Sequence, residues 1–447
     1  MTRQLHLNTF VNAVGHHEAA WRLPDAVPNW NLDIEHYKNL ARIAERGMLD
    51  SVFFADIQGL ISSPSRRPGE MLDPVVKLTA LAGATERIGL IGTASTTFDD
   101  PFNLARRFAS ADIVSGGRIG WNVVTSIAKE IGPNFGVTDF PTPEERYERA
   151  DEFLDVVLKL WDSWENDALV VDKARGVYAD PDKVHRIDHV GKYFSVQGPA
   201  LLPPTPQGRP VIVQAGSSGP GVAFAAKYAE AVFTAQGTIE EGRAFYANLK
   251  SQAAAHGRNT DHIVVLPGLV TVIGSTEAEA QAKARALDEL IVLDHAHAQL
   301  ADQTGVPVER LALDRPLPDD IRRPEDIVDG RSRYEITVEM ARRENLTVRE
   351  LLIRLNASRG HQKLVGTPEQ IAEVIETWFT TGASDGFNVM PATFPDGLEE
   401  FVDQVVPILR SRGLFRSEYE ATTLRGHYGL PMPESTHSSA GLASSAI

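Results

Sequence analysis

The sequence predicts an α/β protein, a (β/α)8 TIM barrel that carries insertions. Short runs rich in β-branched and aromatic residues alternate with longer helical patterns from one end of the chain to the other, which is typical of βαβ units and a parallel sheet. About eight such runs occur, and eight parallel strands close a barrel. The 447 residues exceed an average domain but lie within the range that barrels with insertions reach.

The predicted strands follow one another at the spacing that a barrel requires. They are residues 5–10, 51–55, 88–93, 119–124, 211–215, 231–234, 263–272 and 386–390. Between them, apolar residues recur every three or four positions, as in 147–161 (YERADEFLDVVLKLW). These segments predict amphipathic helices that form the outer ring of the barrel.

We expect one domain over residues 1–430, with two insertions. The first, near 166–209, contains Pro, Gly and short β-like pieces such as YFSV, which predicts a loop excursion. The second, near 274–365, lies between the seventh and eighth strands and combines an Ala- and Glu-rich helix with LDRPLPDDIRRPED. Long insertions on barrels usually shape the entrance to the active site. The tail 431–447 is small, polar and contains Pro, so we expect it to be mobile or to lie over a neighbour.

Composition excludes several classes of function. The formal net charge of -16 argues against nucleic-acid binding, which requires clustered Lys and Arg, and favours a small-molecule ligand. We expect no membrane segment and a cytoplasmic protein, because no apolar run approaches the roughly 20 residues of a membrane-spanning helix. The chain has 0 Cys, which excludes disulfides, thiolate metal sites and cysteine nucleophiles. His295 and His297 are two apart and do not share a helix face, so we predict no metal site.

Polar residues stand where the predicted strands end, and barrel enzymes bind and react at the carboxyl ends of their strands. Such a side chain can also do no more than cap a turn. Four apolar rings on the predicted strands could line a planar cofactor, although strand aromatics usually belong to the core. The polar candidates are Asp56, Thr93, Ser95, Asn122, Thr125 and Ser126, with His16 and His17 after the first strand, and the rings are Phe10, Phe53, Phe54 and Phe233.

The clearest local motif is PVIVQAGSSGPG, an apolar strand followed by Ser217, Ser218 and Gly219 directly before a helical pattern. Backbone N–H groups at a helix N-terminus and serine hydroxyls donate to phosphate, and glycine allows close approach. The motif therefore predicts an anion site. The alternative is that one serine simply caps the helix, because the Walker lysine is absent and generic barrel phosphate sites follow strands seven and eight rather than the fifth.

Several long segments resemble one enzyme family. They include ERGMLDSVFFAD, SGGRIGWNVVTS, RYERADEF, PVIVQAGSS, LVGTPEQIAE and DGFNVMPATFPDGLEEFVDQVVPILRSRGLFR. The chain resembles the nitrilotriacetate, pristinamycin IIA synthase and dibenzothiophene-sulfone monooxygenase family of bacterial luciferase-like flavin enzymes. The resemblance covers most of the chain and implies the same barrel.

The resemblance also implies a two-component monooxygenase. Such an enzyme uses O2 and reduced FMN, which a separate NAD(P)H-dependent flavin reductase supplies, to oxygenate a small organic substrate at or next to S or N, with C–S or C–N cleavage. Relatives form homodimers or homotetramers. The alternatives are a deazaflavin-dependent hydride-transfer oxidoreductase of the same superfamily, a flavin-binding barrel without turnover and, if no flavin binds, a metal-free barrel hydrolase.

Carried over by position, the resemblance assigns flavin contacts to the strand-end residues Asp56, Thr93 and Asn122, and phosphate contacts to Tyr147 and Ser218 beside Ser217. It places His16 over the flavin as a hydrogen-bond donor or proton donor. Two positions depart from the family pattern. Pro143 stands where relatives often have a histidine, and Gln303 stands where the sulfone monooxygenases have a second active-site histidine, which leaves the substrate open.

Overall fold

The computed structural model describes residues 3–12, 14–27, 29–60, 72–126, 128–323, 326–327 and 331–437. Eight parallel strands form a closed ring, because the first and last strands in the chain pair with each other. The predicted (β/α)8 barrel is confirmed, and each strand lies within two residues of its predicted bounds. In ring order the strands are β1 (His6–Phe10), β2 (Ser51–Phe54), β3 (Gly89–Ser95), β4 (Ile119–Val124), β9 (Val211–Ala215), β10 (Ala231–Thr234), β11 (Val264–Ile273) and β13 (Gly386–Pro391).

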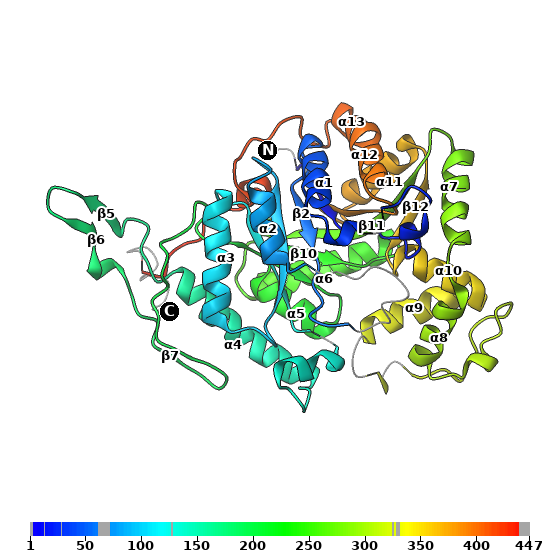
Figure 1. Cartoon of the computed structure of the whole chain (residues 1–447), viewed down its shortest axis with the longest axis horizontal. Helices are drawn as coiled ribbons and strands as arrows, with labels where there is room; N and C mark the ends of the chain where they lie inside the picture. The colour runs from blue at the N-terminus through cyan, green and yellow to red at the C-terminus, as the bar shows by residue number, and fades with distance from the viewer. Residues whose placement is uncertain are drawn as a thin grey trace.

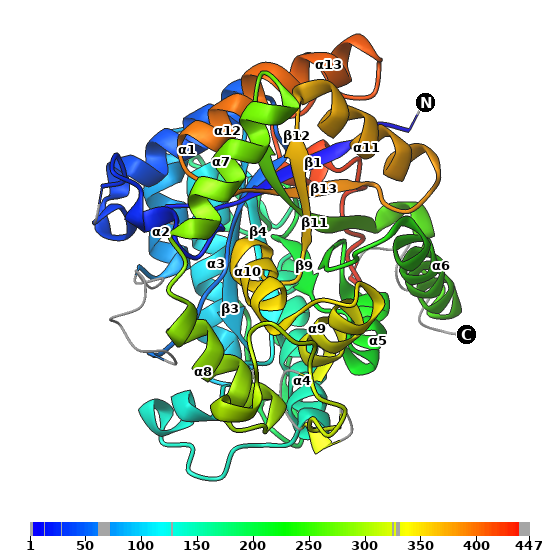
Figure 2. The same cartoon turned by 90° about the vertical axis from the view of Figure 1, so that its right-hand side faces the viewer.

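Helices surround this ring, as Figures 1 and 2 show. The strands are buried on both faces, which explains why their sequences are nearly continuous apolar runs. Most of the helices begin at an Asp, Ser or Thr that accepts a backbone N–H, the usual N-cap. The barrel helices are α1 (Ile34–Arg46), α2 (Pro74–Ala82), α3 (Pro101–Ser115), α4 (Pro143–Trp161), α5 (Gly219–Tyr228), α6 (Ile239–Ala255), α11 (Pro368–Thr380), α12 (Asp396–Glu400) and α13 (Val406–Ser411).

Helix α4 begins four residues earlier than its apolar periodicity indicates. Thr142 accepts the backbone N–H of Glu145, and the Glu145 carboxylate accepts the backbone N–H of Thr142, which forms a capping box. Pro143 occupies the first turn, where its missing N–H costs no hydrogen bond. The extra turn brings Pro143 and Arg146 to the end of the helix that faces the carboxyl ends of the strands.

The first insertion forms an arm that extends away from the barrel on the left of Figure 1. It consists of two antiparallel hairpins, β5 (Leu169–Asp172) with β6 (Val177–Ala179) and β7 (His189–Val190) with β8 (Ser195–Val196). The loop excursion predicted for 166–209 therefore contains regular structure. Its short strands expose large apolar residues, among them Tyr178 at 69% and Val190 at 84%.

The second insertion is helical and has a hydrophobic cluster of its own, which includes Leu300, Tyr334 and Leu351. It comprises α7 (Glu277–Glu289), α8 (Leu293–Thr304), α9 (Arg331–Arg343) and α10 (Val348–Ser358). It ends in strand β12 (Gln362–Gly366), which pairs with β11 at 269–273, beyond the point where β10 stops. This strand was not predicted from its sequence QKLVG. The strand is short, and since only its last residue is fully buried it does not form an apolar run.

The C-terminal segment closes the barrel at the amino ends of the strands. Leu424 and Tyr428, at and after α14 (Leu424–His427), pack against Phe53 and Ile91. Further along, the backbone N–H of Thr436 donates to Asp162 at 2.9 Å. Residues 438–447, most of the tail predicted to be mobile, lie outside the described residues. In the ranges that the structure describes, no helix is both long and apolar enough to cross a membrane.

Candidate active site

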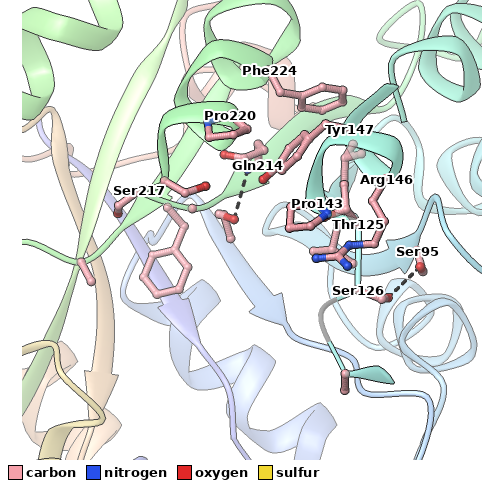
Figure 3. A pocket seen from close by; sticks show the side chains of 18 of the residues that line it. Ser95, Thr125, Ser126, Pro143, Arg146, Tyr147, Gln214, Ser217, Pro220 and Phe224 are labelled. Atoms are coloured by element: carbon pink, nitrogen blue, oxygen red, sulfur yellow. Dashed lines mark hydrogen bonds between the residues drawn. The ribbon is translucent and has the colours of Figure 1, made fainter. Parts of the chain in front are cut away.

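A cavity of about 870 Å³ opens at the carboxyl ends of the strands, and Figure 3 shows many of its walls. Its size lies within the range of about 300–1,000 Å³ that small-molecule sites occupy. Strand ends, the first turns of α4 and α5, and the second insertion all contribute to its lining. The residues used below are Asp56, Ser95, Thr125, Ser126, Pro143, Glu144, Arg146, Tyr147, Gln214, Ser217, Ser218, Phe224, Phe233, Thr234, Ile327, Ile336, Arg359 and His361.

The two serines of the predicted anion motif line this cavity at the start of α5. Ser218 is the N-cap, and its Oγ accepts the backbone N–H of Gly221 at 3.3 Å. The capping alternative is therefore observed. It does not compete with anion binding, because a hydroxyl that accepts one hydrogen bond still has its own proton to donate. Ser217 Oγ lies 2.8 Å from the hydroxyl of Thr234.

Tyr147 reaches the same point from α4. A Cβ atom added at Gly221 would lie 3.0 Å from both Ser218 Oγ and the Tyr147 hydroxyl. Figure 3 shows the Tyr147 ring between Gln214 and Phe224, and the ring centroids of Tyr147 and Phe224 are 5.9 Å apart. Two hydroxyls thus converge at Gly221, where no side chain fills the space. Together with Ser217 they form an arrangement, here called the phosphate cradle, that can accept an anion whose oxygens approach the backbone closely.

Arg146 is a cavity residue that the sequence analysis missed. Its guanidinium is buried, donates to the carbonyl of Pro141 at 2.7 Å and lies 4.9 Å from the Phe140 ring. Figure 3 shows it on the same side of the cavity as Ser126, whose Oγ lies 2.7 Å from that of Ser95. Pro143 offers no side-chain donor, so Arg146 is the cation that α4 brings to this wall. The available signal was its position directly before Tyr147 in RYERADEF.

Gln214 at the end of β9 is a second residue that sequence reasoning missed. Its side chain is 3% exposed and donates from Nε2 to the carbonyl of Ala215 at 3.2 Å. Its Oε1 has no hydrogen-bond partner among the described residues. A buried amide oxygen without a donor is costly, and such atoms usually mark the position of a ligand or water. The cavity wall therefore presents an acceptor for a ligand N–H or O–H.

Asp56 lines the cavity just after β2, as the strand-end argument predicted. Burial raises the pKa of its carboxyl to about 6, and the nearby carboxylate of Asp73 adds to the effect. Asp56 can thus hold a proton near neutral pH or accept a hydrogen bond as a carboxylate. Such a perturbed acid at a barrel entrance is typical of a functional site.

Replacement of Asp56 by Asn should stabilise the protein in a pH-dependent way. Because the pKa of the Asp56 carboxyl is raised, its proton binds more tightly in the folded wild type than in the unfolded chain. The stabilisation that the protonated Asp56 gives the wild type is complete below the unfolded pKa and is lost as pH rises through about 6. We expect Asp56→Asn to exceed the wild type in unfolding free energy by about 1–2 kcal/mol at about pH 8, with little difference at about pH 4. Denaturant unfolding at several pH values measures this, and a difference that does not change with pH would contradict it.

Thr93 and Asn122 form a buried layer beneath the cavity and do not belong to its lining. The Thr93 hydroxyl donates to the carbonyl of Phe54 at 2.8 Å, and Asn122 Nδ2 donates to Thr93 Oγ1 at 2.8 Å. Asn122 Oδ1 has no partner in the described part of the chain. The chain of hydrogen bonds orients Asn122 with this acceptor uncommitted, and the predicted cofactor contact of both residues stays a prediction.

His16 is fully buried and lies one ring away from the cavity. Its ring meets Phe10 edge-on at 4.7 Å, and Phe10 in turn meets the cavity residue Phe233 at 5.6 Å. His16 Nε2 is 2.6 Å from the carbonyl of Phe10. Because a carbonyl only accepts, Nε2 carries a proton, and a donor role toward a ligand falls to Nδ1 of the protonated ring. The catalytic role of His16 stays a prediction.

His17 does not share the environment of its neighbour. It is buried, and its Nε2 lies 3.0 Å from a carboxylate oxygen of Asp288 in α7. This pair attaches the loop after β1 to the second insertion. Gln303, the other position that the resemblance marked, is exposed on α8 and is not part of the cavity lining.

Comparison with known proteins identifies the family of this barrel. A family model described as luciferase-like monooxygenase matches residues 8–385. The chain belongs to the luciferase-like monooxygenase family. The resemblance stated from the sequence segments is thereby confirmed.

Two curated relatives match almost end to end. N-acetyl-S-(2-succino)cysteine monooxygenase of Bacillus subtilis (strain 168) is 46% identical over 96% of this chain and 98% of its own length. Nitrilotriacetate monooxygenase component A of Aminobacter aminovorans is 43% identical over 97% of this chain and 98% of its own length. Among solved structures, EDTA monooxygenase from Chelativorans sp. BNC1 has a TM-score of 0.79 at 37% identity, over 96% of this chain and 99% of that one.

The deazaflavin alternative gains no comparable support. An F420-dependent secondary alcohol dehydrogenase matches with a TM-score of 0.56 at 14% identity, which shows only that the fold is shared. This luciferase-like protein is therefore a monooxygenase, as the sequence predicted.

Proposed function

We propose that this luciferase-like enzyme uses reduced FMN, delivered by a separate flavin reductase, and O2 to oxygenate a small organic substrate next to S or N. Cleavage of a C–S or C–N bond follows. The two curated relatives named above act, by name, on a sulfur compound and an amine, both with several carboxylates. The observation that carries the proposal is the phosphate cradle of Ser217, Ser218 and Tyr147 at one wall of the cavity.

The residues present fit FMN. The phosphate cradle and the Arg146 guanidinium suit one terminal phosphate, because hydroxyls, helix N–H groups and a cation all stabilise its charge. Gln214 Oε1, which lacks a donor in the described structure, suits a hydroxyl of the ribityl chain or a ring N–H. Asp56 lines the cavity just after β2, and Thr93 and Asn122 lie within β3 and β4 beneath it; we assign all three to the part of the site that would hold the isoalloxazine ring.

When bound, reduced FMN supplies the activation of O2. The protein's own residues bind the cofactor, keep water out and orient the substrate. Phe224 and Phe233 give the cavity an apolar surface, and the second insertion covers it with Ile327 and Ile336. We assign to His16 the role of a proton donor through Nδ1, which requires the Phe10 ring between His16 and the cavity to move aside.

Ser218→Ala tests the phosphate assignment against simple helix capping. Thr238 caps α6 with the same geometry, accepting the Glu241 N–H at 3.2 Å, and does not line the cavity, so Thr238→Ala is the matched control. Both variants should lose about 0.5–2 kcal/mol of stability. Only Ser218→Ala should weaken FMN, by about 1–3 kcal/mol through loss of a charge-assisted hydrogen bond.

Flavin fluorescence quenching measures the affinity. The wild type should also prefer FMN over FAD, since the cradle ends the flavin chain at one phosphate. Equal FMN affinity in the Ser218→Ala variant and the wild type would show that Ser218 only caps α5.

We also infer a cytoplasmic location, since the reduced nicotinamide that flavin reductases consume is a cytoplasmic metabolite. For the assembly we infer a homodimer or homotetramer. The arm of residues 166–209 supports self-association, because it extends from the barrel and exposes Leu169, Tyr178 and Val190. Exposed apolar groups of this kind are typical of protein interfaces.

Tyr178→Glu with Val190→Glu should reduce the assembly to smaller species without unfolding the barrel, because charges in an apolar contact carry a desolvation penalty. Light scattering after size-exclusion chromatography measures the mass. Exposed Val308→Glu in the second insertion is the control. A wild-type protein that is monomeric, or a double variant with unchanged mass, would refute the role of the arm.

A further inference from the structure

We propose that Arg359 and His361 form a carboxylate-binding subsite in the cavity, which selects a substrate carrying several carboxylates. The inference rests on the proposed function and specifies its substrate class. Both residues line the cavity, and both belong to the turn between α10 and β12, at the end of the second insertion. The phosphate cradle, in contrast, belongs to α4 and α5.

The turn that carries the two residues has an unusual backbone. Arg359 follows the last residue of α10 with φ of 52°, and Gly360 follows with φ of 82°. A glycine or asparagine is the common choice at the first of these positions, because a side chain makes the left-handed conformation unfavourable. A non-glycine residue held in such a conformation beside a cavity indicates that its side chain is used.

Two other residues fix the position of the His361 ring. Its ring stacks on Phe233, with 5.2 Å between centroids and 15° between planes. A Cβ atom at Gly268 of β11 would lie 2.4 Å from His361 Nδ1, so only glycine admits the imidazole there. His361, which is 8% exposed, is thus fixed at the cavity wall by the Phe233 ring on one face and by Gly268 of β11, which has no side chain, beside it.

Arg359 is oriented by the loop after β1. A guanidinium nitrogen lies 3.6 Å from the carboxylate of Glu18, and the backbone N–H of Glu18 donates to the carbonyl of Asn356 in α10 at 2.9 Å. A guanidinium has five N–H donors in a planar fork, so it can contact Glu18 and a ligand carboxylate together. Glu18 thereby limits the positions that the Arg359 head can take.

The distribution of charged residues around the cavity favours a role for Arg359 in substrate binding. Of the described lining residues, the cationic ones are Arg146, Arg359 and, when protonated, His361, and the anionic ones are Asp56 and the exposed Glu144. Arg146 stands on α4 directly before Tyr147 of the phosphate cradle and serves the cofactor in our proposal. Arg359 and His361 come from the insertion, and we assign them to a second anion, a carboxylate of the substrate. Both named relatives act on compounds with several carboxylates, which agrees with this subsite.

The test is equilibrium binding of N-acetyl-S-(2-succino)cysteine to the FMN-loaded, oxidised protein, measured by calorimetry without turnover. Arg359→Gly removes the side chain and relieves the left-handed backbone, so lost binding with unchanged or higher stability excludes misfolding. We expect a loss of about 10- to 100-fold in affinity, which corresponds to one charge-assisted bidentate contact. His361→Phe keeps the stack on Phe233 and should lose about tenfold in affinity.

Arg354→Gln is the control, because Arg354 lies on α10, pairs with Glu344 at 3.4 Å and is not part of the lining. It should bind the acid and FMN like the wild type, and FMN affinity should also be unchanged in Arg359→Gly. The methyl ester of the acid should bind the wild type weakly, and Arg359→Gly should hardly distinguish acid from ester.

Equal binding of acid and ester by the wild type, or full acid binding by Arg359→Gly, overturns the subsite. If the wild type binds FMN but not the acid, the subsite alone is wrong. If it does not bind FMN, the proposed function fails as well.

Discussion

His16→Asn should fold and bind FMN like the wild type, yet yield almost no oxygenated product. An asparagine amide can still donate to the carbonyl of Phe10, but it cannot supply a proton as an imidazolium can. In the presence of a flavin reductase and substrate we expect O2 consumption to continue, with hydrogen peroxide in place of product. General acid catalysis is worth about 10²–10⁴-fold in rate, so the loss should be large.

His297 provides the matched control for this experiment. Its Nε2 lies 2.7 Å from the carbonyl of Leu311, the same type of contact that His16 makes, but it belongs to α8 and does not line the cavity. His17 is unsuitable, because its replacement would remove a partner of Asp288, which also pairs with Lys363, and so disturb the attachment of α7. His297→Asn should retain the wild-type ratio of product to O2. A His16→Asn enzyme with that ratio would remove His16 from the mechanism.

Asp50→Ala should cause the largest loss of stability. Asp50 is fully buried before β2, where it pairs with Arg416 and accepts the backbone N–H of Leu7 at 2.7 Å. Burial raises the pKa of this carboxyl, but Arg416 and His6 outweigh it and hold the pKa below its ordinary value. Removal of the carboxylate leaves the buried Arg416 charge uncompensated, at a cost of about 3–5 kcal/mol.

Denaturant unfolding measures this loss near neutral pH. Because the folded pKa is depressed, the stabilisation from Asp50 is complete above the unfolded pKa and is lost as pH falls through the folded value. Asp403→Ala is the control, since the Arg46–Asp403 pair is about half exposed and should contribute less than about 1 kcal/mol. Equal effects of the two variants would contradict the larger contribution assigned to the buried Asp50–Arg416 pair.

The strands and the anion motif could be predicted because their signals are local. Each buried parallel strand is an apolar run, and Ser217 and Ser218 stand between such a run and a helix. The strand β12 and the cavity residue Arg146 could not be predicted in this way. β12 depends on an extension of β11 beyond β10, and Arg146 is a charged residue within an amphipathic pattern, where a solvent-facing position is the usual expectation.

The remaining parts of the site depend on contacts between distant segments. Gln214 Oε1 meets no donor among the residues that the structure describes, which no local pattern reveals, and His361 needs both Phe233 and Gly268, which lie on two other strands. Burial of His16 behind Phe10 also follows from tertiary packing. The residue types were visible in the sequence, but their shared environment was not.

The most direct test of the monooxygenase account is a reaction under ¹⁸O2 with N-acetyl-S-(2-succino)cysteine and nitrilotriacetate as separate substrates. The mixture contains the enzyme, NADH, FMN and an independent flavin reductase, and mass spectrometry follows the products. We predict that one ¹⁸O atom enters a product or its cleaved fragment, and that no product forms when the reductase or FMN is omitted. Product that forms without FMN, or that carries oxygen only from water, would contradict the account.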